Sequence, residues 1–329
     1  MKLQQLRCLV EVVHRDLNIT EAARSLYTSQ PGVSHHIRLL EDELGFDVFV
    51  RRGKRVVALT RAGQDVLAIA ERMISDSDNL RRVAGDASRE ASGDLVVAAT
   101  YTQAHLALPA VVRPFIARYP KVRLSIHPCS PAEAAESVRR GEATLCLSTE
   151  VVAAFPDLVM LPGERWHRCV ITPPRHPLLR VRRLDLAAIA EHPLLTYDFA
   201  LKKGSKVQKA FDAAGLTPRV VLTSTDPRII KTYVRAGLGI GLIASIAFEN
   251  ADAARLRLLD ASRLFESSMT TIGIHCNSYI TRYMYDFIEL VLPSMNRAAV
   301  DRMMAGHPPL VRRPRRSASG AGRAANAAP

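Results

Sequence analysis

A change of hydrophobic period near Asp94 constrains the fold of this chain more than any other feature. Before it, apolar residues recur at spacings of three and four, which is typical of amphipathic helices. After it, short β-prone runs alternate with helical segments, which favours a parallel sheet covered by helices on both faces. The 329 residues are enough for two domains of ordinary size. We therefore predict a mainly all-α N-terminal part followed by a larger α/β part.

Three helices are predicted in the N-terminal part, one over residues 2–15 and two within 18–44. Asn18 or Thr20 can cap the second helix. The third helix follows a tight break and opens with a capping hydroxyl from Ser29. The glycine that follows it can supply the left-handed stop. These signals agree on where each helix begins and ends.

Residues 46–59 change to a strand period, and two β-prone runs flank Arg52-Gly53-Lys54. This pattern predicts a hairpin with basic residues at its tip. Thr60 then caps a long helix over 61–90. Three helices and a basic hairpin describe a winged helix-turn-helix, whose third helix enters the DNA major groove. The alternative is a three-helix bundle with a solvated, charged hairpin.

Side chains that can contact DNA gather at the start of the third helix and on the hairpin. Glutamine can pair with adenine, and a helix N-terminus with free N–H groups can hold a phosphate. The hairpin cations suit phosphate or minor-groove contacts, which fix register more than sequence. The acids Glu41, Asp42 and Glu43 must then point away from the duplex. The predicted DNA-binding residues are Thr28, Ser29, Gln30, Pro31, Ser34, His35, Arg38, Arg51, Arg52, Lys54 and Arg55.

The net charge of +13 suggests a polyanionic partner, but its distribution is uneven. Residues 1–90 hold 14 basic and 13 acidic residues, whereas 297–329 hold seven and one. The last segment is rich in proline, glycine, serine, alanine and arginine, which cannot bury enough apolar area to fold. We therefore expect residues 296–329 to be a largely disordered tail that adds sequence-independent affinity for DNA phosphate.

Several classes of protein are disfavoured by the sequence. The N-terminus lacks the pattern of a secretory signal, and no apolar stretch is long enough for a transmembrane helix, so we expect a cytoplasmic protein without a membrane partner. The five cysteines are scattered and are expected to be reduced thiols. The glycine-rich run at 237–241 ends a helix and leads into a strand, the reverse of a nucleotide-binding fingerprint. We expect no enzymatic activity, no cofactor and no metal.

The α/β part predicts two lobes with a cleft at the carboxyl ends of their strands. Thr100 ends the first strand, and Thr102 and Gln103 open the next helix, so their hydroxyls and amide suit a small anion. Thr149 ends another strand and would face the same cleft, although Thr100 and Thr102 could simply cap a helix. The strands are predicted near 95–100, 122–127, 144–149, 167–172, 194–197, 219–223, 240–244 and 270–275. The helices are predicted near 103–118, 131–141, 205–214, 226–236, 279–291 and 297–304.

The residues also carry a resemblance to a known family. The stretch NITEAARSLYTSQPGVSHHIRLLEDELGFDVFVRRGKRVVALTRAGQ closely resembles the DNA-binding domain of LysR-type transcriptional regulators. The blocks MKLQQLR, YTQA, ALP, LVMLP, AGLTPR, IKTYVRAGLG and YMYDFI are similar to the CysB/Cbl subgroup, which regulates sulfur assimilation and sulfonate use. The resemblance covers about residues 1–295.

This resemblance implies a transcriptional regulator with four parts. They are a winged helix-turn-helix over 1–60, a linker helix over 61–92, a periplasmic-binding-protein-like effector domain over 93–295 and the tail over 296–329. The linker helix would pair two chains, and the assembly would be a homotetramer built as a dimer of dimers. The other partners implied are promoter DNA and possible contact with RNA polymerase. The alternative is a small-molecule sensor without DNA-binding activity.

The resemblance also implies an effector site. Thr100, Thr102, Gln103, Thr149 and Trp166 match the positions that line the inducer or anion site of the subgroup. The effector would be sulfate, thiosulfate, acetylserine or adenosine phosphosulfate.

One segment departs from the subgroup. Lys202 stands where the subgroup has a ligand-contacting threonine, and Lys203 follows it. The two lysines could strengthen the attraction of an anion, or both could project into solvent.

Overall fold

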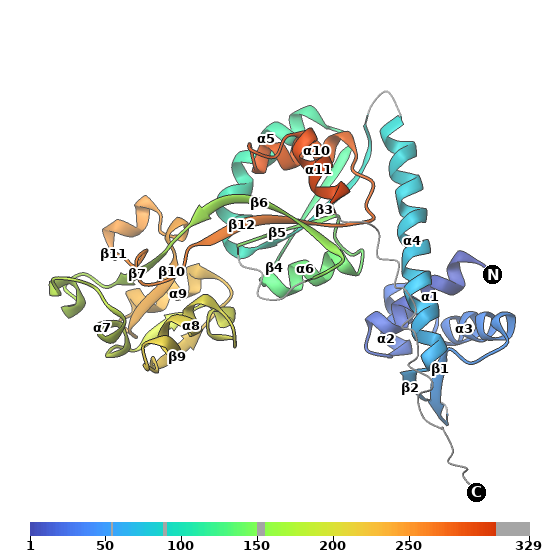
Figure 1. Cartoon of the computed structure of the whole chain (residues 1–329), viewed down its shortest axis with the longest axis horizontal. Coiled ribbons are helices and arrows are strands. Elements are labelled where there is room, and N and C mark those ends of the chain that lie inside the picture. The colour runs from blue at the N-terminus through green and yellow to red at the C-terminus, as the bar shows by residue number, and fades with distance from the viewer. Residues whose placement is uncertain (54, 88–90, 150–154, 307–329) are drawn as a thin grey trace, which may run out of the picture.

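The computed structural model describes residues 1–53, 55–87, 91–149 and 155–306. Figure 1 shows a helical head, a long helix that rises from it, and two α/β lobes. The expected fold class, a winged helix-turn-helix with a linker helix and a two-lobed α/β domain, is therefore confirmed. Within the described ranges, no helix is long and apolar enough to cross a membrane.

The head follows the predicted order of three helices and a hairpin. Asn18 Oδ1 accepts the backbone N–H groups of Thr20 and Glu21 at 3.1 and 3.2 Å, and Ser29 Oγ accepts that of Gly32 at 3.2 Å. The third helix ends at a left-handed glycine with φ +76°, as expected. The elements are α1 (Leu3–His14), α2 (Ile19–Ser25), α3 (Gln30–Leu44), β1 (Phe49–Arg52) and β2 (Arg55–Leu59).

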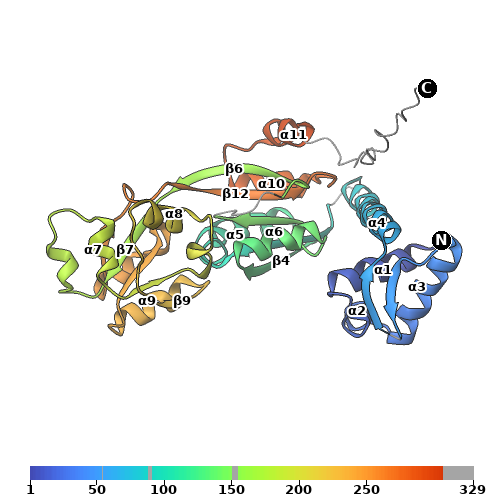
Figure 2. The same ribbon diagram turned by 60° about the horizontal axis from the view of Figure 1, so that its bottom comes forward.

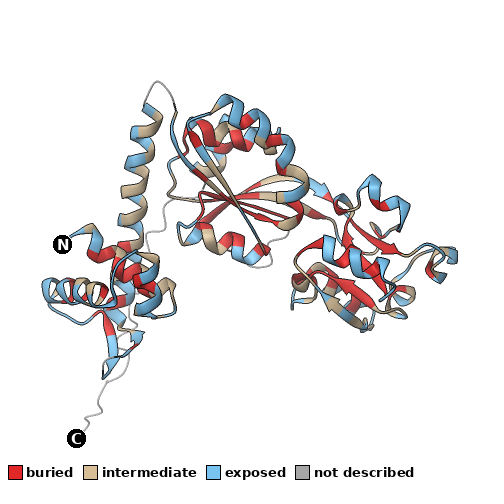
Figure 3. Ribbon diagram, turned by 180° about the vertical axis from the view of Figure 1, so that it is seen from behind, coloured by how far each residue is buried: buried red, intermediate tan, exposed pale blue. Residues whose placement is uncertain are grey.

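The long helix α4 (Arg61–Ala87) packs against α1 at its lower end. Thr60 Oγ1 accepts the backbone N–H of Gly63 at 2.9 Å, so the predicted cap is confirmed. Gly63 and Ala70 are buried against the head, while the other residues of the helix are half-buried or exposed (Figure 3). Large apolar side chains remain exposed along it: Ile69, Met73, Leu80 and Val83.

Lobe I is built on a five-stranded sheet of order β4-β3-β5-β12-β6. Its strands are β3 (Gly93–Thr100), β4 (Val122–Cys129), β5 (Leu145–Ser148), β6 (Leu158–Trp166) and β12 (Ser268–His275). Its helices are the π-helix η1 (Gln103–Ala107), α5 (Leu108–Arg118), α6 (Pro131–Arg139), α10 (Arg282–Val291) and α11 (Arg297–Ala305).

Lobe II is built on a second sheet of order β11-β7-β10-β8-β9. Its strands are β7 (Arg168–Thr172), β8 (Leu194–Thr196), β9 (Val220–Thr223), β10 (Ile240–Ala244) and β11 (Arg257–Asp260). Its helices are α7 (Leu186–Ala190), α8 (Lys206–Ala213) and α9 (Pro227–Arg235), with short 3-10 turns η2 (Pro177–Arg180), η3 (Asp198–Leu201), η4 (Ser245–Ala247) and η5 (Asn250–Ala254).

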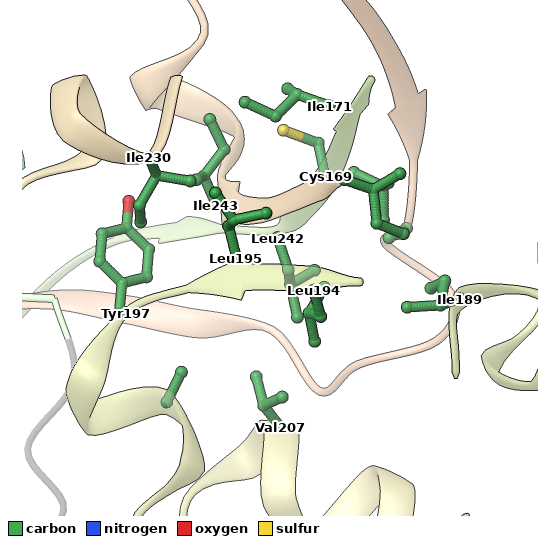
Figure 4. Close-up of a cluster of buried hydrophobic side chains, with 14 of the residues drawn as sticks. Cys169, Ile171, Ile189, Leu194, Leu195, Tyr197, Val207, Ile230, Leu242 and Ile243 are labelled. Carbon is green, nitrogen blue, oxygen red and sulfur yellow. The ribbon is translucent and has the colours of Figure 1, made fainter. Parts of the chain in front are cut away.

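The core of lobe II lies on both faces of its sheet. Figure 4 shows Ile230 of α9 and Val207 of α8 approaching the buried strands from opposite sides. Gly239 lies in the turn between α9 and β10 with φ +158°, and a Cβ there would lie 2.1 Å from the Pro193 carbonyl oxygen. The glycine-rich run is therefore a tight turn between a helix and a strand, as the order of its elements predicted.

The prediction of parallel sheets was wrong in part. In lobe I, β3 pairs in parallel with β4 and β5, but β12 is antiparallel to both β5 and β6. In lobe II, β7 is antiparallel to β10 and β11. The strand near 270–275 belongs to the first sheet rather than the second. The reason is that the chain crosses to lobe II along β6 and returns along β12, so these two strands run in opposite directions (Figure 1).

The C-terminal helix α11 was predicted over 297–304 and is confirmed. It lies beside β6 and α10 on one side of lobe I (Figure 2), and Val300 is fully buried there. The packed chain therefore reaches Ala305, beyond the boundary expected at 296. The rest of the predicted tail, residues 307–329, lies outside the described residues.

Candidate DNA-binding surface and effector cleft

The start of α3 forms an exposed polar surface on the head. Ser34 is half-buried, and the other predicted DNA-binding residues of this segment are exposed. These exposed residues are Thr28, Ser29, Gln30, Pro31, His35 and Arg38. The fold therefore brings the residues predicted to read bases to one accessible helix end.

A cavity of about 820 Å³ joins this helix end to the hairpin. It is lined by Gln30, by Arg52 and Arg55 of the hairpin, and by the segment 14–21 that leads into α2. Arg140 at the end of α6 also lines it, so lobe I reaches the same surface. Four arginines and two carboxylates stand in this lining, so its charge favours an anionic partner such as a DNA phosphate.

Glu41 organises the hairpin from inside the head. Its carboxylate is 6% exposed and accepts the backbone N–H groups of Val48 and Phe49 at 2.9 and 3.1 Å. It also accepts both ends of the Arg51 guanidinium, at 3.2 and 2.6 Å. Glu41 therefore points away from the exposed end of α3, as predicted. Arg51 is exposed but is paired with the buried Glu41, whereas no such buried partner holds Arg52 or Arg55 within the described residues.

Lys54, which the sequence predicts at the tip of the hairpin, lies outside the described residues. Sequence reasoning missed Tyr27, which it treated only as part of the break between two helices. Tyr27 has a left-handed φ of +51° and is 98% exposed, two residues before Ser29, the capping residue of α3. An aromatic residue in such a turn was the signal that could have identified it.

The predicted effector residues form a buried polar cluster, with the exception of Lys202. Thr100 ends β3, Thr102 and Gln103 begin the π-helix, Thr149 follows β5, and Trp166 ends β6. Each is at most 8% exposed. Single-turn π-helices are frequent at functional sites, and this one replaces the first part of the helix expected over 103–118, which is confirmed over 108–118 as α5.

Several polar atoms of this region have no hydrogen-bond partner within the described ranges. They include Thr100 Oγ1, Trp166 Nε1 and Ser268 Oγ. Trp166 and Ser268 are directly opposite each other on β6 and β12. A buried polar group without a partner costs about 1–3 kcal/mol, so a ligand that supplies partners would stabilise the lobe. Sequence reasoning missed Ser268, because its position beside Trp166 depends on strand pairing across 102 residues.

Two contacts tie the cluster to neighbouring elements. Gln103 Nε2 donates to Thr270 Oγ1 of β12 at 3.3 Å. Tyr197 of lobe II accepts the backbone N–H of Ala244 at 3.3 Å, and burial raises the pKa of its hydroxyl. The side chain of Thr102 interacts with that hydroxyl and opposes the rise in pKa. Tyr197 therefore links lobe II to Thr102, a contact that the sequence did not predict.

A buried cation stands next to the cluster. Arg168 is 2% exposed, and its guanidinium carbon lies 5.3 Å from the centre of the Trp166 ring. Such a cation–π contact fixes the orientation of the indole. The sequence did not predict that Arg168 lies beside the effector residues, because a single arginine in a strand does not indicate that its side chain will be buried.

Lys202 does not join the buried cluster. Lys202 and Lys203 are both exposed after the η3 turn. Lys202 nevertheless faces α6 of lobe I, where hydrogen bonds from Ser130 lower the pKa of Glu133 and the Lys202 charge lowers it further. Lys202 thus stands near the first turn of α6, outside the group of buried hydroxyls.

Comparisons with known proteins agree with this arrangement. A family described as bacterial regulatory helix-turn-helix protein, lysR family, matches residues 3–64, and one described as LysR substrate binding domain matches residues 88–296. The regulator SsuR of Burkholderia cenocepacia is 45% identical over 91% of this chain and 97% of its own length. The regulator CysB of Haemophilus influenzae is 43% identical over 92% of this chain and 93% of its own length. A crystal structure of the cofactor-binding domain of the Cbl transcriptional regulator is 34% identical with a TM-score of 0.60, and the match covers 65% of this chain and 93% of that one.

Proposed function

Because this chain belongs to the LysR family of transcriptional regulators, in its CysB/Cbl-like subgroup, we propose that it controls genes of sulfur metabolism in response to a small effector. The family consists of regulators and not of enzymes. The genes would serve cysteine biosynthesis and the uptake of sulfate or sulfonates, and the protein would act in the cytoplasm. One observation supports this proposal most directly. The same chain holds an exposed, basic helix-turn-helix surface and a buried cluster that includes polar atoms without hydrogen-bond partners among the described residues.

The DNA contacts divide into two groups. Gln30, Ser34, His35 and Arg38 would reach base edges, since they lie on the first turns of α3. The other predicted residues would hold the backbone and fix the register. These are Thr28, Ser29, Pro31, Arg51, Arg52, Lys54 and Arg55, and the pairing of Arg51 with Glu41 also supports the hairpin. The basic residues of the tail would add affinity that does not depend on sequence.

The effector would be an oxyanion held by hydroxyl, amide and indole donors. Thr100, Thr102, Gln103, Thr149 and Trp166 would line the site, and Ser268 would join them. Sulfate, thiosulfate, acetylserine and adenosine phosphosulfate all present oxygen acceptors to such donors. Lys202 would attract the anion towards the cleft by its charge.

The assembly would be a homotetramer built as a dimer of dimers. The exposed side chains Ile69, Met73, Leu80 and Val83 recur along α4 at helical spacings and would pack against α4 of a second copy. Pairing would remove this apolar stripe from water and set two heads side by side. Two heads read two half-sites, and RNA polymerase would be the further partner at the promoter.

A gel-shift experiment tests the proposal. Labelled promoters of sulfate- and sulfonate-transport genes should be shifted by the full chain far below the concentration that shifts random DNA. Trp166 is the only tryptophan of the chain, so its fluorescence reports ligand binding independently. Folded protein that gives a fluorescence response but no shift at low salt would overturn the regulator and support a sensor without DNA-binding activity.

A further inference from the structure

We propose that Asn79 is a positioning residue that transmits the state of the effector cleft to the DNA-binding head, through strand β12 and the linker helix α4. The proposal rests on the proposed function of the cleft and adds the route by which its occupancy reaches the DNA-binding surface. It follows from four sets of contacts along one continuous path.

The path begins in the cleft. Ser268, the first residue of β12, lies opposite Trp166 on β6, and its hydroxyl has no partner among the described residues. Thr270 accepts the amide of Gln103 at 3.3 Å. A ligand that binds Gln103, Trp166 or Ser268 therefore acts directly on the first residues of β12.

Strand β12 carries this change as a unit. It pairs with β6 from Ser268 to His275, with one irregularity between Met269 and Thr271, and with β5 on its other side over residues 271–273. It is also one of the strands along which the chain passes between the lobes (Figure 1). Packed strands deform little internally. A rotation of lobe II that closes the cleft must therefore shift β12 as a whole.

The far end of β12 is fastened to α4. Asn79 Nδ2 donates to the Asn277 carbonyl oxygen at 2.7 Å, and Asn79 Oδ1 accepts the Tyr279 backbone N–H at 2.9 Å. The side-chain amide of Asn79 thus donates one hydrogen bond to the backbone of this turn and accepts one from it, as the backbone of a neighbouring strand would. Asp86 adds a second anchor, since it accepts the backbone N–H of Arg282 at 3.0 Å and the Tyr279 hydroxyl at 3.2 Å.

The lower half of α4 is fastened to the head. Ala70 is buried in the core of the head, and His14 Nε2 lies 3.1 Å from Glu71 Oε1. Arg7 of α1 pairs with Asp78 at 3.6 Å, one residue before Asn79. A shift of the 277–282 turn therefore reaches the helix at the point where the head also holds it.

The test uses the full chain, four probes and two readouts. The probes are sodium sulfate, sodium thiosulfate, acetylserine and adenosine phosphosulfate. Trp166 fluorescence measures their binding, and hydrogen–deuterium exchange measures the protection of α4 with and without the bound probe. The variants are Asn79→Ala and Asn79→Asp, with Asp76→Ala as the matched control, because Asp76 is exposed on the same helix.

In the wild-type chain and in Asp76→Ala, probe binding should change exchange in α4 by about 5-fold or more, the lower end of ordinary allosteric coupling. Asn79→Ala should bind the probe with Kd within about twofold of wild type and lose most of the exchange response in α4. Asn79→Asp should give an intermediate response, because it keeps the acceptor for Tyr279 N–H and loses the donor to Asn277.

An exchange response in α4 that is as large in Asn79→Ala as in wild type would overturn the proposal. So would probe binding to the wild-type chain that leaves exchange in α4 unchanged. Exchange is read without DNA, so a failure of the wild-type chain to shift promoter DNA would refute the proposed regulator and leave this coupling standing.

Discussion

The DNA-facing surface and the effector cleft use the same kinds of side chain in opposite surroundings. Thr28 and Gln30 are exposed at the start of α3, whereas Thr100 and Gln103 are buried at 4% and 3% exposure. Exposed donors remain hydrated until DNA arrives and add nothing to the stability of the fold. A buried group without a partner in the described chain, such as the Thr100 hydroxyl, lowers its stability until a ligand arrives. Substitutions on the DNA-facing surface should therefore alter binding alone, while substitutions in the effector cleft should alter both binding and stability.

The largest effect is expected from Gln30→Ala. If Gln30 pairs with a base, its loss should weaken binding to the promoter by about 1–3 kcal/mol, or about 5- to 150-fold, and leave binding to random DNA unchanged. Thermal unfolding should not change, because the side chain is exposed. Competition gel shifts measure the ratio of the two affinities. Equal losses on promoter and random DNA would show that Gln30 does not read bases.

Glu41→Gln tests whether the exposed surface depends on buried support. The substitution removes the charge that holds Arg51 and the turn into the hairpin. Hydrogen bonds to charged groups contribute about 1.5–3 kcal/mol, and the partial exposure of Arg51 argues for the lower end. Urea unfolding should show this loss, and Asp42→Asn, an exposed neighbour, should not. Unchanged stability and unchanged DNA affinity would mean that the hairpin holds its shape without Glu41.

Thr102→Ala tests the buried side of the comparison. Loss of the hydroxyl should weaken the ligand-induced change in DNA binding by about 5- to 10-fold, the usual effect of one lost hydrogen bond, with basal DNA binding intact. Thr144→Ala is the matched control, since Thr144 is equally buried and accepts the Val96 N–H at the opposite end of the sheet. Ligand titrations followed by Trp166 fluorescence and gel shift measure both steps. A titration identical to wild type would remove Thr102 from the site.

The head could be predicted from its sequence almost in full, because its signals are local. The caps at Asn18, Ser29 and Thr60 each depend on a backbone group two or three residues away. The same local signals located Thr100, Thr102 and Gln103 where a strand meets a helix. Residues of this kind can be identified without knowing which strands pair.

The remaining part of the cleft depends on distant pairing. Ser268 joins the site only because β12 returns beside β6, and Tyr197 reaches Thr102 only because the two lobes meet. The register of these strands depends on the return of the chain from lobe II along β12, and no short stretch of sequence predicts that return. For the same reason β6 was not predicted and β12 was assigned to the wrong lobe.

The smallest expected effect lies where the two regions meet, at Glu136 of α6. Hydrogen bonds from Arg139 and then Arg140 lower the pKa of Glu136 from its ordinary 4.5 to about 2, and Arg140 also donates to the His14 carbonyl oxygen of the head at 3.3 Å. A depressed carboxylate pKa stabilises the fold above about pH 4.5, and that stability is lost as the pH falls towards 2.

Glu136→Gln should therefore reduce the loss of stability between about pH 4.5 and 2, by about 1 kcal/mol or less because the ion pairs are partly exposed. Glu289→Gln, an exposed carboxylate on α10, is the control and should leave the pH profile unchanged. Urea unfolding across this pH range measures the difference. If Glu136→Gln unfolds with the same pH profile as wild type, the contact between head and lobe I does not depend on the charge of this carboxylate.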